Sequence, residues 1–184
     1  RADRLPMELG GMRCTGISAF SYQSLRNALG LPPKPTRIYD SDQMLALPHL
    51  DVLDALGCDV VIVEGDGLTN AYEQPDLWHP YDFNGRIPGG QVRDRRPYRA
   101  DPDGSIHKGG GSSMPPGAYV FNAEHAGQPL ILDGDLPRPD LKQVRQDLAK
   151  ASLTDEQVKS LRDTFRRVRE CSDRAAFFWG QVNM

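Results

Sequence analysis

The stretch LGCDVVIVEGDG, residues 56–67, contains the most strand-like run in this chain of 184 residues. Positions 60–63 are all β-branched, and a continuous apolar run of this length is typical of a parallel strand buried on both faces. The sequence therefore predicts a strand over Asp59–Val63. Glu64 and Asp66 follow it directly, which raises the question of why two carboxylates stand at the end of a buried strand.

The segments that precede this strand predict an α/β fold. A short apolar run, Leu5–Leu9, is followed by two glycines and predicts a first strand. Apolar residues recur at helical spacing over 17–29, and Gly30 stands where a helix C-cap is expected. A second helix is expected over Met44–Leu56, bent or broken at Pro48. The order strand, helix, helix, strand is typical of a parallel sheet with crossover helices.

A long excursion is expected after the second strand, over residues 67–123. This segment is rich in proline, glycine and aromatic residues, with turn signals at Asn84–Gly85 and Asp101–Gly104. The pattern predicts an irregular or β-rich region that ends in a strand at Ala118–Phe121. Because a βα connection needs only a few residues, an excursion of this length favours a role in function or partner binding.

Two helices are expected in the last third of the chain. One covers Leu141–Ala149, and the other opens at Thr154, where the sequence TDEQ predicts a capping box between Thr154 and Gln157. The second helix has an apolar face made of Val158, Leu161, Phe165 and Val168.

Composition narrows the function classes. A net charge of −3 argues against nucleic-acid binding through bulk electrostatics, and no apolar run approaches membrane-spanning length. Three widely spaced cysteines form neither a disulfide framework nor a metal-binding pair, so we expect a cytoplasmic protein. The chain starts without methionine and ends on an apolar segment. We therefore expect one domain over 1–184 that is a piece of a longer protein.

Three stretches resemble the uroporphyrinogen decarboxylase superfamily, and most closely its divergent, methyltransferase-like branch. They are DRLPMELGGMRCTGISAFSYQSLRNALGLPPKPTRIYDSDQM near the start, GCDVVIVEGD, and the pattern WHPYDFNG…DPDGS…SSMPPGAYVFN within the excursion. Members of this superfamily are TIM (β/α)8 barrels, which need ~250 residues. The resemblance thus implies a partial barrel, the N-terminal portion only, with a β-rich excursion after its second strand.

The resemblance implies one of two chemistries. Decarboxylases of this superfamily act on porphyrinogen acetates, and the methyltransferases pass methyl groups to or from a corrinoid carrier. The decarboxylases carry an arginine-rich motif after the first strand, whereas this sequence reads GGMRCTG there, with only Arg13 nearby. This departure favours methyl transfer. The zinc ligands of the methyltransferase branch belong to the C-terminal half, so no metal ligand is assigned here, and a corrinoid protein is the implied partner.

Asp66 is the candidate catalytic residue, because the family's aspartate at this position hydrogen-bonds the substrate and stabilises its charge. Arg13, Glu64 and His79 are candidate substrate-binding residues. The charged candidates could also have purely structural roles. Glu64 or Asp66 could cap the next segment or pair with an arginine of the excursion. Arg13 could pair with Glu8 or Asp66. Porphyrinogen decarboxylation and a non-catalytic binding module remain alternative functions. If the protein is an enzyme, we expect a small-molecule substrate. A homodimer is left open.

Overall fold

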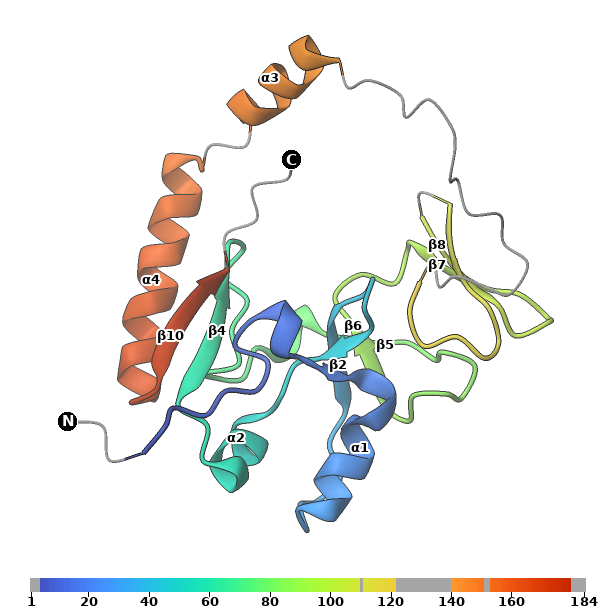
Figure 1. The fold of residues 1–184 in the computed structure, drawn as a ribbon, viewed down its shortest axis with the longest axis horizontal. Coiled ribbons are helices and arrows are strands. Elements are labelled where there is room, and N and C mark those ends of the chain that lie inside the picture. Colours follow the sequence, from blue (N-terminus) through green and yellow to red (C-terminus); the bar gives the residue numbers. More distant parts are fainter. Residues whose placement is uncertain (1–3, 110, 122–139, 151–152, 180–184) are drawn as a thin grey trace.

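The structure is a computed structural model that describes residues 4–109, 111–121, 140–150 and 153–179. In these residues the fold is mixed α/β with three sheets, none of which closes into a barrel (Figure 1). The α/β class is therefore confirmed at this coarse level.

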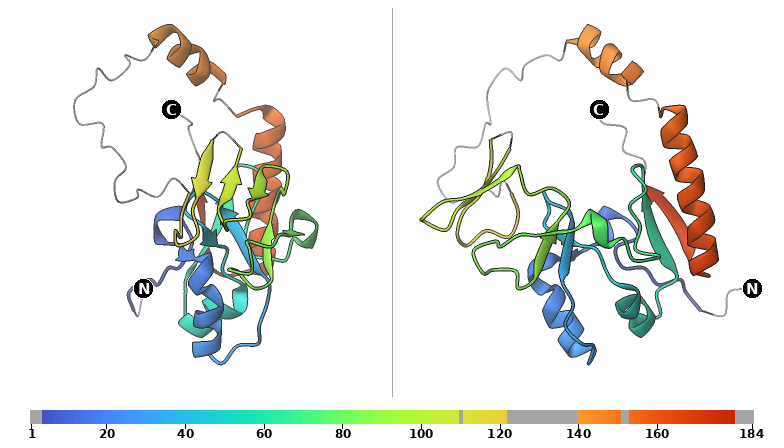
Figure 2. Two further views of the ribbon diagram at one scale, coloured as in Figure 1. Left: turned by 90° about the vertical axis from the view of Figure 1, so that its right-hand side faces the viewer. Right: turned by 180° about the vertical axis from the view of Figure 1, so that it is seen from behind.

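A parallel strand pair lies at one end of the molecule. Strand β4 (Val60–Glu64) pairs in parallel with β10 (Ala175–Trp179). Helix α4 (Asp155–Cys171) leads into β10 and runs alongside the pair (Figures 1 and 2). Its buried Leu161 and Val168 share an apolar cluster with Val61 and Val63 of β4, so helix and strand bury each other's apolar faces.

Helix α4 begins as its sequence predicts. The side chain of Thr154 accepts a hydrogen bond from the Gln157 amide at 3.2 Å, and the Gln157 side chain accepts one from the Thr154 amide at 2.9 Å. The predicted capping box is therefore confirmed. Strand β10 was not predicted, although Ser172 and Asp173 precede its apolar run and Gly180 follows it.

A second sheet occupies the centre of the molecule (Figure 1). Its five strands lie in the order β1, β3, β2, β6, β5. Helix α1 (Ala19–Ala28) packs on this sheet, and Gly30 follows it with φ at +68°. The strands cover Ile17–Ser18 (β1), Thr36–Asp40 (β2), Leu45–Ala46 (β3), His79–Pro80 (β5) and Gly90–Val92 (β6).

The excursion supplies strands to two sheets, so its β-rich character is confirmed for the part that the structure describes. Strands β5 and β6 extend the central sheet, with β6 parallel to β2. The third sheet is an antiparallel meander of β7 (Tyr98–Ala100), β8 (Ile106–Lys108) and β9 (Ser112–Met114). Residues 122–123 lie outside the described part of the chain.

The remaining described elements are helices. These are the 3-10 helices η1 (Arg13–Thr15) and η2 (Pro75–Leu77), helix α2 (Leu50–Leu56) and helix α3 (Leu141–Lys150).

Three predicted elements are wrong. Leu5–Leu9 forms no strand; its one backbone hydrogen bond to the β4 region, from the Asp59 amide to the Met7 carbonyl, is too little for a ladder. The helix predicted over Met44–Leu56 exists only in α2, because residues 45–46 pair with two neighbouring strands instead. Ala118–Phe121 forms no strand; it follows a turn that closes where the Ala118 amide donates to the Pro115 carbonyl.

Two further findings concern the cysteines and the helices. Cys14, Cys58 and Cys171 are all free thiols. None of the helices in the described part of the chain has the length and apolarity needed to cross a bilayer.

Candidate functional site

The loop after β4 is a tight turn that folds back on the strand. The Glu64 amide donates to the Leu68 carbonyl at 2.8 Å, and the Gly67 amide donates to the Glu64 carbonyl at 2.9 Å. One carboxylate oxygen of Asp66 accepts from the Leu68 amide at 3.0 Å. Gly67 has φ at +84°, and a Cβ there would lie 3.2 Å from Oγ1 of Thr164 on α4, so the turn requires glycine at this position.

Arg13 joins the ends of two strands that belong to different sheets. Its Nε and Nη2 atoms both donate to Oε1 of Glu64 at the end of β4, at 3.2 and 3.1 Å. Its Nη1 atom lies 3.4 Å from Oδ2 of Asp40, the last residue of β2. The Glu8 carboxylate accepts from the Gly11 and Met12 amides and so holds the turn that carries Arg13. Arg13 therefore pairs with neither of the two carboxylates considered from the sequence, Glu8 and Asp66.

We call Arg13, Tyr39, Asp40 and Glu64 the Arg13 cluster. The side chains of Asp40 and Glu64 are only 4% and 7% exposed. Burial raises the pKa of Glu64, although the Arg13 guanidinium opposes that rise. The Tyr39 hydroxyl is buried and has no hydrogen-bond partner within the described part of the chain, and burial together with the charges of Asp40 and Glu64 raises its pKa.

Asp66 forms an ion pair with Arg93, which follows β6 in the excursion. The two side chains are 47% and 33% exposed, so solvent reaches both. Asp66 thus has both structural roles considered from the sequence, as a turn cap and as the partner of an arginine in the excursion. Its catalytic role stays a prediction.

His79 lies in β5, where its register partner is Val92, the residue before Arg93. It is exposed, and none of the described hydrogen bonds or ion pairs joins it to Asp66. The structure therefore brings Arg13, Glu64 and Asp66 together at the end of β4, and none of the contacts found among the described residues joins His79 to them.

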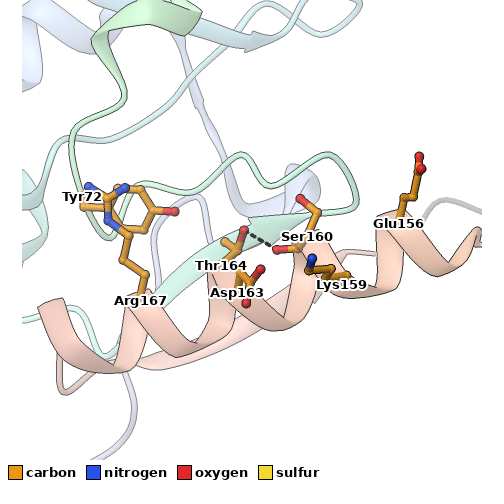
Figure 3. A pocket seen from close by; sticks show the side chains of 7 residues that line it. All are labelled: Tyr72, Glu156, Lys159, Ser160, Asp163, Thr164 and Arg167. Carbon is orange, nitrogen blue, oxygen red and sulfur yellow. Dashed lines mark hydrogen bonds between the residues drawn. The ribbon is translucent and has the colours of Figure 1, made fainter.

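A surface groove of about 450 Å³ lies between α4 and Tyr72, in the segment that follows the β4 loop (Figure 3). The guanidinium of Arg167 lies over the Tyr72 ring at 4.0 Å, and the Thr164 hydroxyl donates to the Ser160 carbonyl. The groove carries charges of both signs, from Glu156, Lys159, Asp163 and Arg167. Its side chains do not converge on one ligand chemistry, so we assign it no function.

Sequence reasoning missed three members of this region: Tyr39, Asp40 and Arg93. One signal was available, because the stretch TRIYD at 36–40 ends on a carboxylate as VVIVE at 60–64 does. The described residues contain no group of three or more histidine, cysteine or acidic side chains that could hold a metal ion.

Comparison with known proteins does not extend this picture. No family model matches the chain, and neither a curated protein nor a solved structure does. The resemblance to the uroporphyrinogen decarboxylase superfamily therefore stays a prediction from the residues.

Proposed function

We propose that this chain belongs to an α/β barrel enzyme, similar to the uroporphyrinogen decarboxylases, that acts in corrinoid-linked methyl transfer. The observation that carries the proposal is the gathering of Arg13, Glu64, Asp66 and Arg93 at the carboxyl end of β4. Active sites of α/β barrels lie at the carboxyl ends of their parallel strands. The parallel pairing of β4 with β10 across α4 supports a barrel, because a strand–helix–strand unit is its repeating element.

The charge balance at this edge favours methyl transfer over porphyrinogen decarboxylation. A porphyrinogen carries several carboxylates and needs several available cations for binding. Arg13 and Arg93 are each paired with carboxylates of the protein already. Together Asp40, Glu64 and Asp66 carry more charge than these two guanidiniums compensate. A neutral or cationic substrate therefore fits this edge better than a polyanion.

In this proposal Asp66 contacts the substrate and stabilises positive charge that develops on it. Arg13 and Glu64 bind its polar groups, and His79 contributes from β5. Zinc would supply a Lewis acid for the methyl donor or acceptor. Since the described residues offer no ligand group, zinc would be held by residues outside them, and we derive no step through it. A corrinoid protein would be the partner, and the cytoplasm the compartment.

The proposal is tested by methyl transfer between methylcobalamin and a thiol, using protein produced from the complete reading frame under anaerobic conditions. The thiolate takes the methyl group, the cobalt–carbon bond breaks, and its electron pair stays on cobalt as cob(I)alamin, which absorbance detects. Asp66→Asn should lower the rate by about tenfold or more, as expected when a charge-stabilising group is lost. Asp76→Asn, an exposed carboxylate in η2, is the matched control and should leave the rate unchanged.

Two results would overturn the proposal. Release of carbon dioxide from uroporphyrinogen without methyl transfer would assign the chain to the decarboxylases. Absence of both reactions in the corrinoid- and zinc-supplied protein would favour a non-catalytic binding module.

A further inference from the structure

Two of the three thiols lie at the amino end of the β4–β10 pair, opposite the edge that the proposed function uses. Cys58 stands two residues before β4, and Cys171 is the last residue of α4, the helix that leads into β10 (Figure 1). The chain that follows Cys171 is hydrogen-bonded to the segment that carries Cys58. The Nε atom of Arg174 donates to the Cys58 carbonyl, and the Ala175 amide donates to the Asp59 carbonyl, both at 2.8 Å. The fold therefore brings together two cysteines that are more than 100 residues apart in the sequence.

The two cysteines belong to the same packing interface. Cys58 is 4% exposed and shares an apolar cluster with Val168, which lies in the last turn of α4. Cys171 follows Val168 by three residues, so both lie on the face of α4 that packs on β4. Cys171 is exposed, which places it at the open end of this interface. The helix thus turns the Cys171 side chain toward the segment that carries Cys58.

A single surface cavity of about 660 Å³ joins the two cysteines, and both of them line it. Arg174 lines this cavity as well, but its guanidinium pairs with Asp54 and donates to the Cys58 carbonyl. Asp59, another lining residue, pairs with Arg4. These ion pairs have a structural role, whereas the two thiols are the lining groups that can form a covalent bond with each other.

We propose that Cys58 and Cys171 form a redox pair, which a peroxide oxidises to a disulfide bond. With hydrogen peroxide, the Cys171 thiolate attacks one oxygen, the O–O bond breaks, and a sulfenic acid and one water form. The Cys58 sulfur then attacks the Cys171 sulfur, the S–O bond breaks, and a second water leaves as the disulfide forms. The two thiols lose two electrons and two protons, and the peroxide is reduced to two waters.

The two positions suit different steps of this reaction. Cys171 is exposed and accessible to peroxide, whereas burial raises the pKa of the Cys58 thiol and disfavours its thiolate. A disulfide needs Cα atoms about 5–6 Å apart. Because helix ends fray, the last turn of α4 can adjust to that spacing. The bond ties the end of α4 to the start of β4, and in a reducing compartment it forms only while oxidant is present.

The test is oxidation of the native protein, produced from the complete reading frame, with a small excess of hydrogen peroxide, followed by peptide mapping without reduction. We expect a peptide pair that links Cys58 to Cys171 and that dithiothreitol separates. The oxidised protein should melt a few degrees above the reduced protein, because the bond closes a loop of more than 100 residues.

Variants and an unfolded control locate the pair. Cys14→Ser removes the other exposed thiol and should leave the link unchanged, whereas Cys171→Ser should abolish the link and the melting shift. Cys58→Ala should do the same. If Cys58→Ala fails to fold, Cys171→Ser, at an exposed position, still decides the question. Oxidation in urea should instead favour the link of Cys14 to Cys58, because unfolded chains close shorter loops more readily.

Several results would overturn this inference. They are a native link that involves Cys14, a disulfide between two chains, and sulfinic acid at Cys171 without any link to Cys58. A linked protein that melts no higher than the reduced protein would show that the bond does not fit the native fold, and it would overturn the inference too. The test needs neither a corrinoid nor a methyl donor, so its outcome is independent of the proposed function.

Discussion

Two buried arginine clusters in this molecule have opposite balances of charge and hydrogen bonds. We call Tyr22, Arg26, His49 and Asp51 the Arg26 cluster. Arg26 is fully buried, its Nη1 and Nη2 atoms donate to the two oxygens of Asp51 at 2.9 and 3.0 Å, and Lys34 adds a second cation at 3.0 Å. The Tyr22 hydroxyl accepts from the His49 amide and lies 2.8 Å from its ring nitrogen Nδ1.

The Arg13 cluster differs in each of these respects. It has two carboxylates for one guanidinium, and its buried Tyr39 hydroxyl has no hydrogen-bond partner among the described residues. Hydrogen bonds from Arg26 hold the pKa of Asp51 well below its usual range, whereas burial raises the pKa of Glu64. Burial of an arginine–carboxylate pair is therefore no sign of a binding site by itself. The unpartnered Tyr39 hydroxyl and the excess of carboxylates over guanidinium distinguish the Arg13 cluster, which lies at the strand end that the proposed function uses.

The largest expected effect is the loss of stability on Asp51→Asn. This substitution leaves the fully buried Arg26 guanidinium without a charged partner and should lower the free energy of unfolding by about 3–5 kcal/mol. Urea denaturation at pH 7 measures the change. A loss below about 1 kcal/mol would show that the ion pair of Arg26 and Asp51 contributes little to stability. The Arg26 cluster could then no longer serve as the structural cluster with which the Arg13 cluster is compared.

A pH dependence of nearly the same size is expected from His49. Burial, together with the positive charges of Arg37 and Arg26, lowers the pKa of His49 to about 4. Above its unfolded value of about 6.5 both states are neutral, so the full stability is present there. Below that pH the unfolded state takes up the proton first, and the free energy of unfolding falls by about 3 kcal/mol down to pH 4.

Urea denaturation between pH 4 and 7 checks this dependence, with His49→Gln as the variant that cannot titrate at this position. The variant should lose less stability across this range than the wild type. Parallel curves for the two proteins would mean that His49 is not held neutral in the Arg26 cluster.

The smallest effect is expected for Glu64→Gln. The amide oxygen still accepts from Arg13, and the substitution removes a carboxylate whose charged form burial disfavours. The free energy of unfolding at pH 7 should change by less than about 1 kcal/mol. In the wild type the contribution of Glu64 becomes less favourable as the pH rises from its unfolded pKa through the raised folded pKa, and the variant should lack this slope. A loss as large as that of Asp51→Asn would make the Arg13 cluster structural as well.

Local sequence signals predicted the elements whose contacts are close in sequence. The TDEQ capping box and the apolar face of α4 depend on residues within one helix, and the β-branched run of β4 depends on its own burial. Residues 45–46 were misread as helical because their strand form depends on pairing with β1 and β2. Strand β10 depends in the same way on β4, from which it is more than 100 residues distant.

The candidate site was predictable only in part for the same reason. The position of Glu64 and Asp66 at a strand end is a local feature, and the sequence analysis found it. Arg13 meets Asp40 and Glu64 only because the second sheet brings the end of β2 beside the end of β4. No pattern within a single element indicates that contact. The pairing of Asp66 with an arginine of the excursion was considered from the sequence, but the sequence did not identify Arg93 as that arginine.

The most direct test of the difference between the two clusters is an NMR titration of their carboxyl groups by ¹³C chemical shift, with Glu64→Gln and Asp51→Asn for assignment. We expect Glu64 to titrate above its ordinary value of 4.5 and Asp51 to titrate below its ordinary value of 3.8. A Glu64 carboxyl that titrates at or below 4.5 would mean that its negative charge is already compensated. The Arg13 cluster would then not differ from the Arg26 cluster in its balance of charge.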